Sequence, residues 1–266
     1  MLIEQSAARA GVAMMPPVAA RSGEYVVHYE ENGDSIWARA YPWLEGQPGC
    51  WWQGDERSCF EVARLMAQIH RLVVPVAALD EPVWQAPDQI GWEALVRRAR
   101  EQGQGWSELL LEKTPFLLRA CASEAALAPL RTTPSQRDYH FPNLMTTARG
   151  EHVLVDWDAA GPTIARIEAV RFALVWATPE RGPPQRDLVR AFVRGYTSAG
   201  GEFAPPSLDE LAYVEEHKPV PWWIWYNVQR ELSPQPSPDP TLLPILLGQL
   251  RHADPAWLKQ LAALFH

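Results

Sequence analysis

Lysine is scarce in this sequence of 266 residues, and its distribution is uneven. Lys113, Lys218 and Lys259 are the only lysines, so residues 1–112 contain none. Any chemistry that is assigned to residues 1–112 must therefore proceed without a lysine amine.

Cysteine is also rare, and its spacing matches no known framework. Cys50, Cys59 and Cys121 are odd in number and include no C-x-x-C pair, which argues against a disulfide framework or a thiolate zinc site. We interpret them as free thiols. The sequence contains no G-x-S-x-G and no H-E-x-x-H motif, so hydrolase and zinc-enzyme functions lack support.

Long apolar runs and an excess of positive charge are absent as well. No uncharged apolar run approaches the roughly 18 to 20 residues that a bilayer needs. Glu4 and Arg9 interrupt the segment where a signal peptide would need an apolar core. With 24 basic and 32 acidic residues, the net charge of −8 disfavours nucleic acid polymers as partners. We predict a cytoplasmic protein with no membrane partner.

The pattern of apolar residues predicts a short β-containing start and a mainly helical remainder. A helix is expected to end at Gly11, and strands over residues 24–29 and 35–41 flank Asn32-Gly33, a strong hairpin turn signal. A second hairpin is expected over residues 143–147 and 152–156. Helical spacing predicts helices over residues 60–72, 92–111, 116–127, 164–177, 188–199, 208–216, 221–232, 242–251 and 256–264.

Two acidic residues and an amide occupy a loop and a hairpin, where side chains can converge. Asp138 and Asn143 lie in RDYHFPN, and Asp156 lies thirteen residues after Asn143 in LVDWD. Phosphoryl transfer needs a carboxylate that accepts the proton of an attacking hydroxyl, and oxygen ligands that hold magnesium. Asp138 suits the first task, and Asn143 and Asp156 suit the second. The alternative is purely structural, with turn formers and a strand-end cap.

The D-x-x-x-x-N element followed by a strand that ends in D-W-D resembles the aminoglycoside phosphotransferase family of kinase-like enzymes. Residues 39–46 are similar to the linker between the two lobes of that family, and residues 63–72 to the helix that follows. The resemblance implies an α+β, protein-kinase-like fold with two lobes. We expect a truncated, β-containing N-terminal lobe over residues 1–45 and a large helical C-terminal lobe over residues 46–266.

The resemblance also implies roles for the site residues. Asp138 would be the catalytic base, Asn143 and Asp156 would bind Mg²⁺ and the nucleotide, and Asp158 would be a supporting carboxylate and a further candidate ligand. ATP would be the phosphoryl donor. A small hydroxylated molecule, such as an aminoglycoside or another amine, would be the acceptor, as in antibiotic resistance. Gln136 stands where the family has a histidine, and it can hold the loop by hydrogen bonds.

Two features of the resembled site are not found before Asp138. The sequence there has no G-x-G-x-x-G loop and no strand lysine, so the phosphate-gripping strands are expected to be missing. Glu4, the candidate for the helix glutamate that pairs with that lysine, is expected to have no partner. Two functions stay open, an ATP-dependent phosphotransferase and a noncatalytic pseudokinase that binds a ligand or a protein. An exposed face of the N-terminal lobe would favour a homodimer.

The remaining aromatic and histidine residues have mainly structural interpretations. Thirteen tryptophans are far above average, and Trp157 and Trp176 are expected in the core, although a tryptophan-lined acceptor cleft is an alternative. His140 is expected to orient the loop around Asp138 or to point to solvent, and His70 to pack or cap near the end of its helix.

Overall fold

The computed structural model describes residues 1–31, 34–49, 54–75, 79, 86–217, 220–234 and 239–266. The predicted Asn32-Gly33 turn, Cys50 and Lys218 lie outside the described residues. Within the described ranges, no helix is both long enough and apolar enough to span a bilayer.

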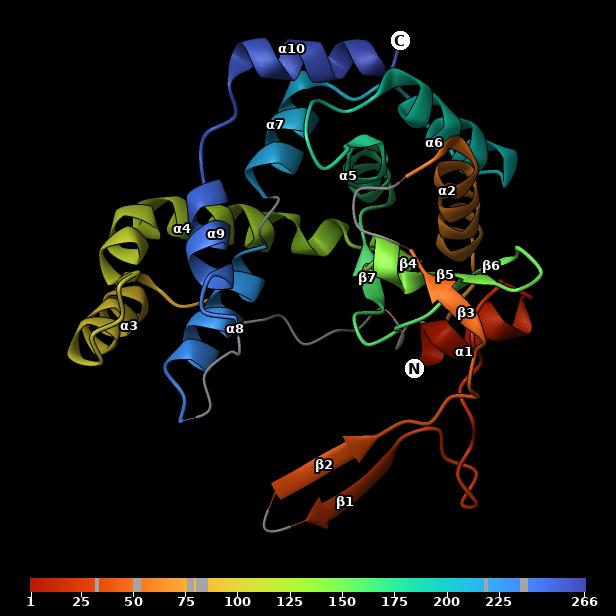
Figure 1. Cartoon of the computed structure of the whole chain (residues 1–266), viewed down its shortest axis with the longest axis horizontal. Helices are drawn as coiled ribbons and strands as arrows, with labels where there is room; N and C mark the ends of the chain where they lie inside the picture. Colours follow the sequence, from red (N-terminus) through yellow and green to blue (C-terminus); the bar gives the residue numbers. More distant parts are fainter. Residues whose placement is uncertain (32–33, 50–53, 76–78, 80–85, 218–219, 235–238) are drawn as a thin grey trace. The chain divides into compact units, whose positions relative to one another are not determined.

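Helices dominate the chain, and the strands are short (Figure 1). The helices are α1 (Leu2–Arg9), α2 (Glu56–His70), α3 (Gln89–Glu101), α4 (Ser107–Leu127), η2 (Ala128–Leu130), η3 (Phe141–Asn143), α5 (Ala165–Ala177), α6 (Arg186–Ser198), α7 (Leu208–Glu216), α8 (Pro221–Glu231), α9 (Leu242–Gln249) and α10 (Pro255–Leu264). The strands are β1 (Val27–Glu31), β2 (Asp34–Ala38), β3 (Gly46–Pro48), β4 (Thr133–Ser135), β5 (Leu144–Thr147), β6 (His152–Leu154) and β7 (Gly161–Thr163).

The chain forms two compact units, and each is assembled from separate stretches of sequence. The first unit comprises Met1–Glu81, Arg131–Pro205 and Ala263–His266, and the second comprises Pro82–Leu130 and Pro206–Ala262. The predicted boundary between residues 45 and 46 lies within the first unit. The two compact units do not correspond to the two predicted lobes, and the boundary between the lobes therefore stays a prediction.

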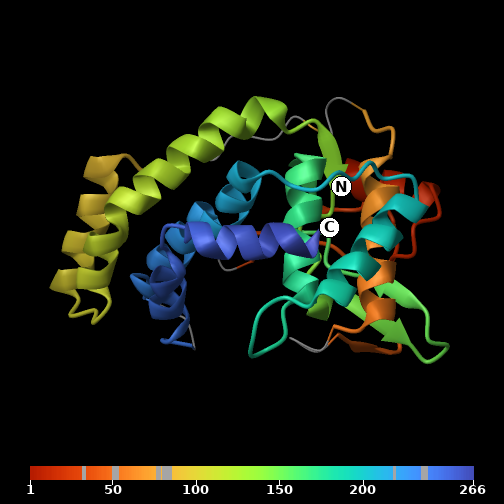
Figure 2. The same cartoon turned by 90° about the horizontal axis from the view of Figure 1, so that it is seen from above.

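The core of the first unit is built around α2, α5 and α6. Asp55 caps α2 by accepting a hydrogen bond from the Ser58 N–H at 2.7 Å, and the apolar face of the helix is buried. Helices α2 and α6 lie side by side (Figure 2). Their close approach requires Gly195, because a Cβ there would lie 2.1 Å from the Phe60 carbonyl oxygen.

Two small antiparallel ladders of the first unit join segments on either side of the second hairpin. Strand β5 pairs with β6, with Leu144 opposite Leu154, and β4 pairs with β7, with Ser135 opposite Gly161. Strand β3 adds to the outer edge of β5. The loop between β4 and β5 and the turn between β6 and β7 are therefore held together at both ends. The second hairpin was predicted from the sequence, and the structure confirms it.

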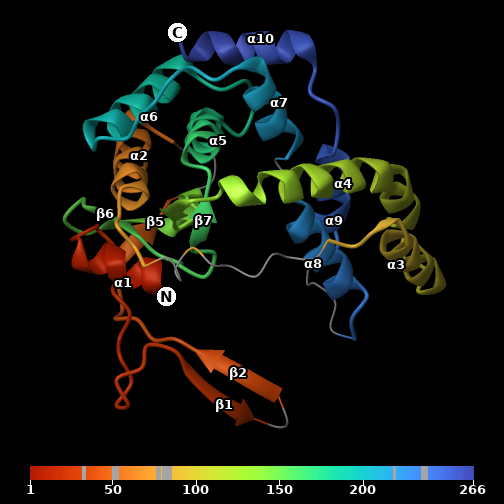
Figure 3. The same cartoon turned by 180° about the vertical axis from the view of Figure 1, so that it is seen from behind.

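The predicted N-terminal hairpin is present, and its strands are offset from the predicted bounds. Strands β1 and β2 pair from Val27 opposite Ala38 to Glu31 opposite Asp34, and they project from the rest of the first unit (Figures 1 and 3). The helix expected to end at Gly11 is α1, and Gly11 has a φ of 73°. Glycine adopts this left-handed conformation without steric cost, which explains the end of the helix.

The second unit corrects the predicted helix over residues 92–111. Helix α3 ends at Glu101, and Gly103 with a φ of 68° separates it from α4. Helix α4 then continues through Pro115, where a proline would ordinarily break a helix. Pro115 has no N–H to donate to the carbonyl of Leu111, a residue that is 40% exposed.

Trp157 and Trp176 are buried in the core of the first unit, as predicted, with 1% and 2% of their surfaces exposed. Cys59 and Cys121 are free and buried, in agreement with the interpretation as structural thiols. Burial raises the pKa of Cys59 to about 12 and that of Cys121 to about 11. Neither thiol is therefore suited to nucleophilic chemistry.

Candidate active site

Asp138 is held by two neighbours within the loop between β4 and β5, which we call the catalytic loop (residues 136–143). The Asn143 side-chain amide donates to both the carbonyl oxygen and Oδ2 of Asp138, each at 2.9 Å. Nδ1 of His140 contacts Oδ1 of Asp138. The sequence-based expectation that His140 orients this loop agrees with that contact. Asp138 therefore has a fixed carboxylate that is 37% exposed.

The environment of Asp138 keeps its carboxyl ionised. Burial raises the pKa of Asp138, but hydrogen bonds from His140 and Asn143 and the positive charge of Arg171 outweigh burial, so the pKa lies below its ordinary value. An ionised carboxylate can accept a hydrogen bond from an acceptor hydroxyl, orient that hydroxyl and take its proton.

Gln136 connects the catalytic loop to the turn between β6 and β7, which we call the acidic turn (residues 155–160). Gln136 is fully buried, and its side-chain oxygen accepts the Asp138 N–H at 2.9 Å. Its side-chain amide donates to the carbonyl oxygens of Val155 and Asp156. Since glutamine supplies both a donor and an acceptor, it can satisfy both loops without titrating.

A deeper layer of buried polar groups supports the catalytic loop. Ser135 donates to the Glu168 carboxylate at 2.6 Å, and His70 contacts the same carboxylate oxygen at 2.7 Å. The Trp176 indole donates to the Tyr139 carbonyl oxygen at 2.6 Å. His70 thus has a polar partner beyond the packing role that the sequence suggested. These contacts leave the loop little freedom to move.

The acidic turn presents its carboxylates to solvent from an unusual backbone. Arg137 and Asp156, with φ values of 65° and 56°, are the non-glycine residues with positive φ in the described part of the chain. Both lie in this site, and such conformations gather at functional sites. Gly161 leaves room for the Arg137 guanidinium, since a Cβ there would lie 2.6 Å from its central carbon.

The oxygen donors of the site fit a magnesium ion. The Asn143 amide nitrogen is used on Asp138, which leaves its Oδ1 as an acceptor, and the Asp156 carboxylate is exposed. Burial and the negative charge of Asp138 raise the pKa of Asp156, as expected for neighbouring carboxylates that a cation would stabilise. In the described ranges, no group of three His, Cys, Asp or Glu side chains could hold a metal. Asn143 and Asp156 would supply two oxygen ligands, and Mg²⁺ is usually bound by one or two carboxylates together with water and phosphate.

Glu4 has a partner, so the expectation that it stands alone is wrong. Glu4 on α1 is fully buried, and Arg39 Nη1 lies 3.3 Å from its Oε2. The other end of the same guanidinium contacts Asp158. Burial of Glu4 without a cation would be costly, and this cost explains why an arginine accompanies it.

The structure brings the predicted site residues together in the first unit. Asp138 and Asn143 are in direct contact, and Asp156 is close enough for the charge of Asp138 to act on it. Asp158 follows on the acidic turn, where its N–H donates to Asp156 Oδ1 at 3.3 Å. Sequence reasoning missed the supporting role of Ser135 and the linking role of Arg39, because both depend on contacts with residues far away in the sequence.

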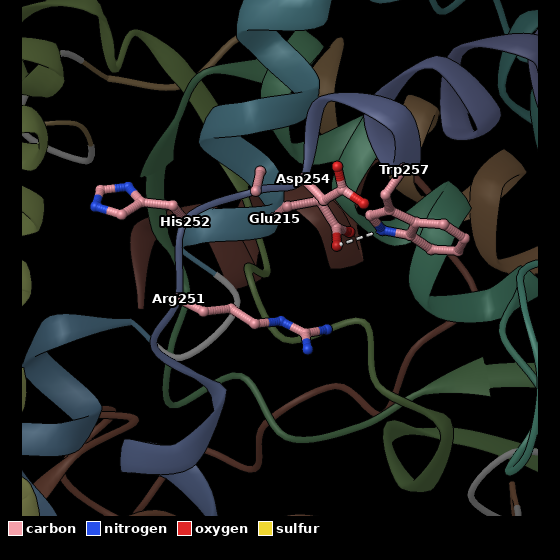
Figure 4. A pocket seen from close by; sticks show the side chains of 6 residues that line it. Glu215, Arg251, His252, Asp254 and Trp257 are labelled. Carbon is pink, nitrogen blue, oxygen red and sulfur yellow. Dashed lines mark hydrogen bonds between the residues drawn. The ribbon is translucent and has the colours of Figure 1, made fainter.

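The second unit contains a separate cavity of about 420 Å³ (Figure 4). It is lined by Glu215, Arg251, His252, Ala253, Asp254 and Trp257. The Trp257 indole faces Glu215 and donates to its carboxylate at 3.0 Å, whereas His252 points away from it. Glu210, earlier on α7, completes a capping box with Ser207. Glu210 and Glu215 thus make structural contacts within the second unit.

The sequence matches the model of the phosphotransferase enzyme family, APH, over residues 5–211. The chain therefore belongs to this family, and the resemblance inferred from its motifs is confirmed. Comparison with curated proteins returned no match.

Solved structures of kinases share the fold of the chain. A spectinomycin phosphotransferase in complex with ADP and spectinomycin is 15% identical, with a TM-score of 0.59 over 98% of this chain and 80% of that one. Its AMP-bound complex is 14% identical, with a TM-score of 0.59 over 98% and 82%. An amicoumacin kinase in complex with AMP-PNP, Ca²⁺ and Ami is 12% identical, with a TM-score of 0.52 over 93% and 75%. The predicted kinase-like α+β fold is confirmed.

Proposed function

We propose that the chain is an ATP-dependent small-molecule phosphotransferase that uses Asp138 as its catalytic base. The observation that carries the proposal is the contact of Asn143 with Asp138, beside Asp156, at the junction of two strand ladders. Membership in a phosphotransferase family supports it independently.

The residues of the site have distinct tasks in this reaction. Asp138 accepts the proton of the acceptor hydroxyl while the hydroxyl oxygen forms a bond to the γ-phosphorus of ATP. The bond between that phosphorus and the bridging oxygen of the β-phosphate breaks, and ADP is released. Asn143 and His140 hold the Asp138 carboxylate in a fixed orientation. Asn143 and Asp156, with Asp158 as a further candidate, would hold Mg²⁺, which neutralises phosphate charge when bound.

We further propose a hydroxylated amine, with aminoglycosides the first to try, as the acceptor. The neighbouring spectinomycin phosphotransferase was solved with spectinomycin, and the net charge of −8 favours a cationic small molecule. A panel of hydroxylated amines, assayed for phosphate transfer from Mg-ATP, tests this class. Transfer to neutral alcohols alone would contradict it.

Replacement of Asp138 tests the base directly. The Asp138→Ala variant should lose roughly 10²- to 10⁴-fold in turnover, because proton transfer by a positioned side chain contributes about that much. Its unfolding midpoint should stay close to that of the wild type. Asp187→Ala, which removes an exposed carboxylate from α6, is the matched control and should keep full turnover. Unchanged turnover in Asp138→Ala would reject the assigned base.

A noncatalytic binding module is the second candidate, favoured by the lack of lysine in residues 1–112 and of a glycine-rich loop before Asp138. Titration with Mg-ATP separates the two functions. Nucleotide binding with phosphate transfer supports the enzyme, whereas acceptor binding without nucleotide binding supports the module.

We also propose that the chain forms a homodimer through its N-terminal hairpin. Trp37 on β2 is 70% exposed and shares a face of the hairpin with His28 on β1, with ring centroids 4.6 Å apart, and exposed aromatic surface of this kind is typical of an interface. Light scattering should report a dimer for the wild type and a monomer for Trp37→Ser. A monomeric wild type would refute the proposal.

A further inference from the structure

Arg39 joins two carboxylates that are far apart in the sequence. Its Nη1 lies 3.3 Å from Glu4 Oε2 on α1, and its Nη2 contacts Asp158 Oδ1 on the acidic turn. A guanidinium is a rigid planar fork with several donors, so it can serve two anions at once. One side chain thus connects α1 to the candidate metal site.

The backbone around Arg39 is also fixed. The next residue, Ala40, accepts a hydrogen bond from the Val18 N–H at 2.8 Å. Burial and the neighbouring Glu4 carboxylate raise the pKa of Tyr41 to about 12. Arg39 therefore has a defined position at the site.

The two ion pairs of Arg39 differ in how easily they can be exchanged. The Glu4 side chain is 0% exposed, whereas the Asp158 side chain is 79% exposed. Breaking the buried pair would leave an uncompensated charge in the protein interior, which is costly. Breaking the exposed pair costs little, because water solvates the released carboxylate. The Glu4 half of the guanidinium is thus an anchor, and the Asp158 half is exchangeable.

The exchangeable half lies next to the proposed magnesium ligands. Asp158 donates its N–H to Asp156 Oδ1 at 3.3 Å, and the charge of Arg39 acts on Asp156 against the effects of burial and of Asp138. A phosphate group that shares a cation with Asn143 and Asp156 is expected to meet this guanidinium. The neighbourhood is rich in carboxylates, so an anionic ligand needs such a cation.

We propose that Arg39 is a phosphate-binding residue, and that a nucleotide phosphate replaces the Asp158 carboxylate on Nη2 while Glu4 retains Nη1. The inference rests on the proposed nucleotide-dependent function and extends it to a residue outside the catalytic motifs. Guanidinium groups bind phosphate and carboxylate with the same geometry, so one anion can replace the other. Within the described residues, Arg39 supplies the cation that pairs with Glu4.

The test compares the affinities of ADP and adenosine, both measured by calorimetry in buffer with Mg²⁺. The double variant Glu4→Gln/Arg39→Gln removes the guanidinium without leaving a buried carboxylate unpaired. The matched control is Glu61→Gln/Arg64→Gln, which neutralises an ion pair of 2.8 Å on α2. The wild type and the control should bind ADP more tightly than adenosine. The Glu4/Arg39 variant should lose about tenfold or more in ADP affinity, the value of a charged hydrogen bond, and keep its adenosine affinity.

The possible results separate this inference from the proposed function. If the Glu4/Arg39 variant keeps the full preference for ADP, the role of Arg39 is refuted and the phosphotransferase proposal stands. A wild type that binds adenosine and ADP equally well also refutes the role of Arg39 as a phosphate-binding residue. If the wild type binds neither compound, both proposals fail. Should the glutamine variant not fold, Glu4→Met/Arg39→Met replaces it, since apolar residues of similar volume commonly substitute for buried ion pairs.

Discussion

The catalytic loop and the acidic turn each supply half of the candidate site, and the protein holds them in different ways. The catalytic loop rests on buried side chains, with Gln136 fully enclosed and Tyr139 bonded to Trp176. The acidic turn has a single buried side chain at its centre, Trp157, between two exposed aspartates. It is linked to the rest of the site through Gln136 and Arg39, and also through Arg137, which donates to the Ala159 carbonyl oxygen.

This difference matches what the proposed reaction would require of each half. A catalytic base has to be in position before the substrate arrives, because misplacement by about 1 Å can cost on the order of 100-fold in rate. Ligands of a metal and its phosphates carry charges that repel one another until the cation binds. An exposed turn tolerates that repulsion, whereas a buried one would be destabilised by it.

Gln136→Ala should have the largest effect on stability, because this side chain belongs to both halves. The change leaves the Asp138 N–H and two carbonyl oxygens of the acidic turn without their partner. We expect a loss of about 2–4 kcal/mol in the free energy of unfolding, from buried groups left unsatisfied. Urea unfolding measures it. Gln89→Ala, at an exposed position of α3, should change the value by less than about 0.5 kcal/mol. Equal effects would contradict the linking role.

Ser135→Ala should have a smaller effect, since it removes one buried hydroxyl beneath the catalytic loop. The Glu168 carboxylate and the Arg137 N–H lose a hydrogen-bond partner, and we expect a loss of about 1–3 kcal/mol in unfolding free energy. Ser22→Ala is the control, because Ser22 is exposed. If both variants unfold at the same urea concentration as the wild type, the buried support is not what holds the loop.

Asp156→Asn should leave stability nearly unchanged and should weaken metal binding. Burial and Asp138 raise the pKa of Asp156, so the folded chain disfavours the charged carboxylate, and a neutral amide should cost less than about 0.5 kcal/mol. The Mg²⁺ concentration that supports half-maximal nucleotide binding should rise at least about tenfold. Loss of a residue that only hydrogen-bonds to a metal ligand already lowers metal affinity by about that much. An unchanged Mg²⁺ requirement would remove Asp156 from the metal site.

Cys59, which contacts the Trp176 carbonyl oxygen, allows a chemical test of the packing near the catalytic loop that leaves the sequence unchanged. Its pKa is raised by burial to about 12, so the thiol stays protonated until the pH approaches that value, and only the thiolate reacts. At pH 8.5, we expect Cys59 to be alkylated at least about 100 times more slowly in the folded chain than in the chain unfolded in urea. Mass spectrometry measures both rates. Comparable rates would indicate a loosely packed support.

Local pattern predicted much of the secondary structure. The helix over residues 208–216 coincides with α7, Leu208–Glu216, because an apolar face, a serine cap and a glutamate three residues later act within one segment. The failure over residues 92–111 has an equally local cause. Gly103 separates α3 from α4, although the helical spacing of apolar residues continues past it. Helix α4 then passes through Pro115, one turn after the exposed Leu111.

The pairing of Glu4 with Arg39 was not predictable from the same patterns. The two residues are separated by a helix, a long irregular segment and a hairpin, and nothing in either local sequence marks the other. Ser135 and Glu168 are a similar case. Long-range ion pairs and hydrogen bonds depend on burial, and burial is a property of the assembled core.

The sequence by itself determined the residue types and order of the candidate site, which is why Asp138, Asn143 and Asp156 could be named from their spacing. Only the tertiary structure decided that Asn143 contacts Asp138 and that Asp156 lies near enough to feel the charge of Asp138. Hydrogen-bonded pairing of β4 with β7 and of β5 with β6 closes the distance between them. The tertiary structure also decided that Arg39 lies beside them, because a buried carboxylate needs a cation from wherever the fold supplies one.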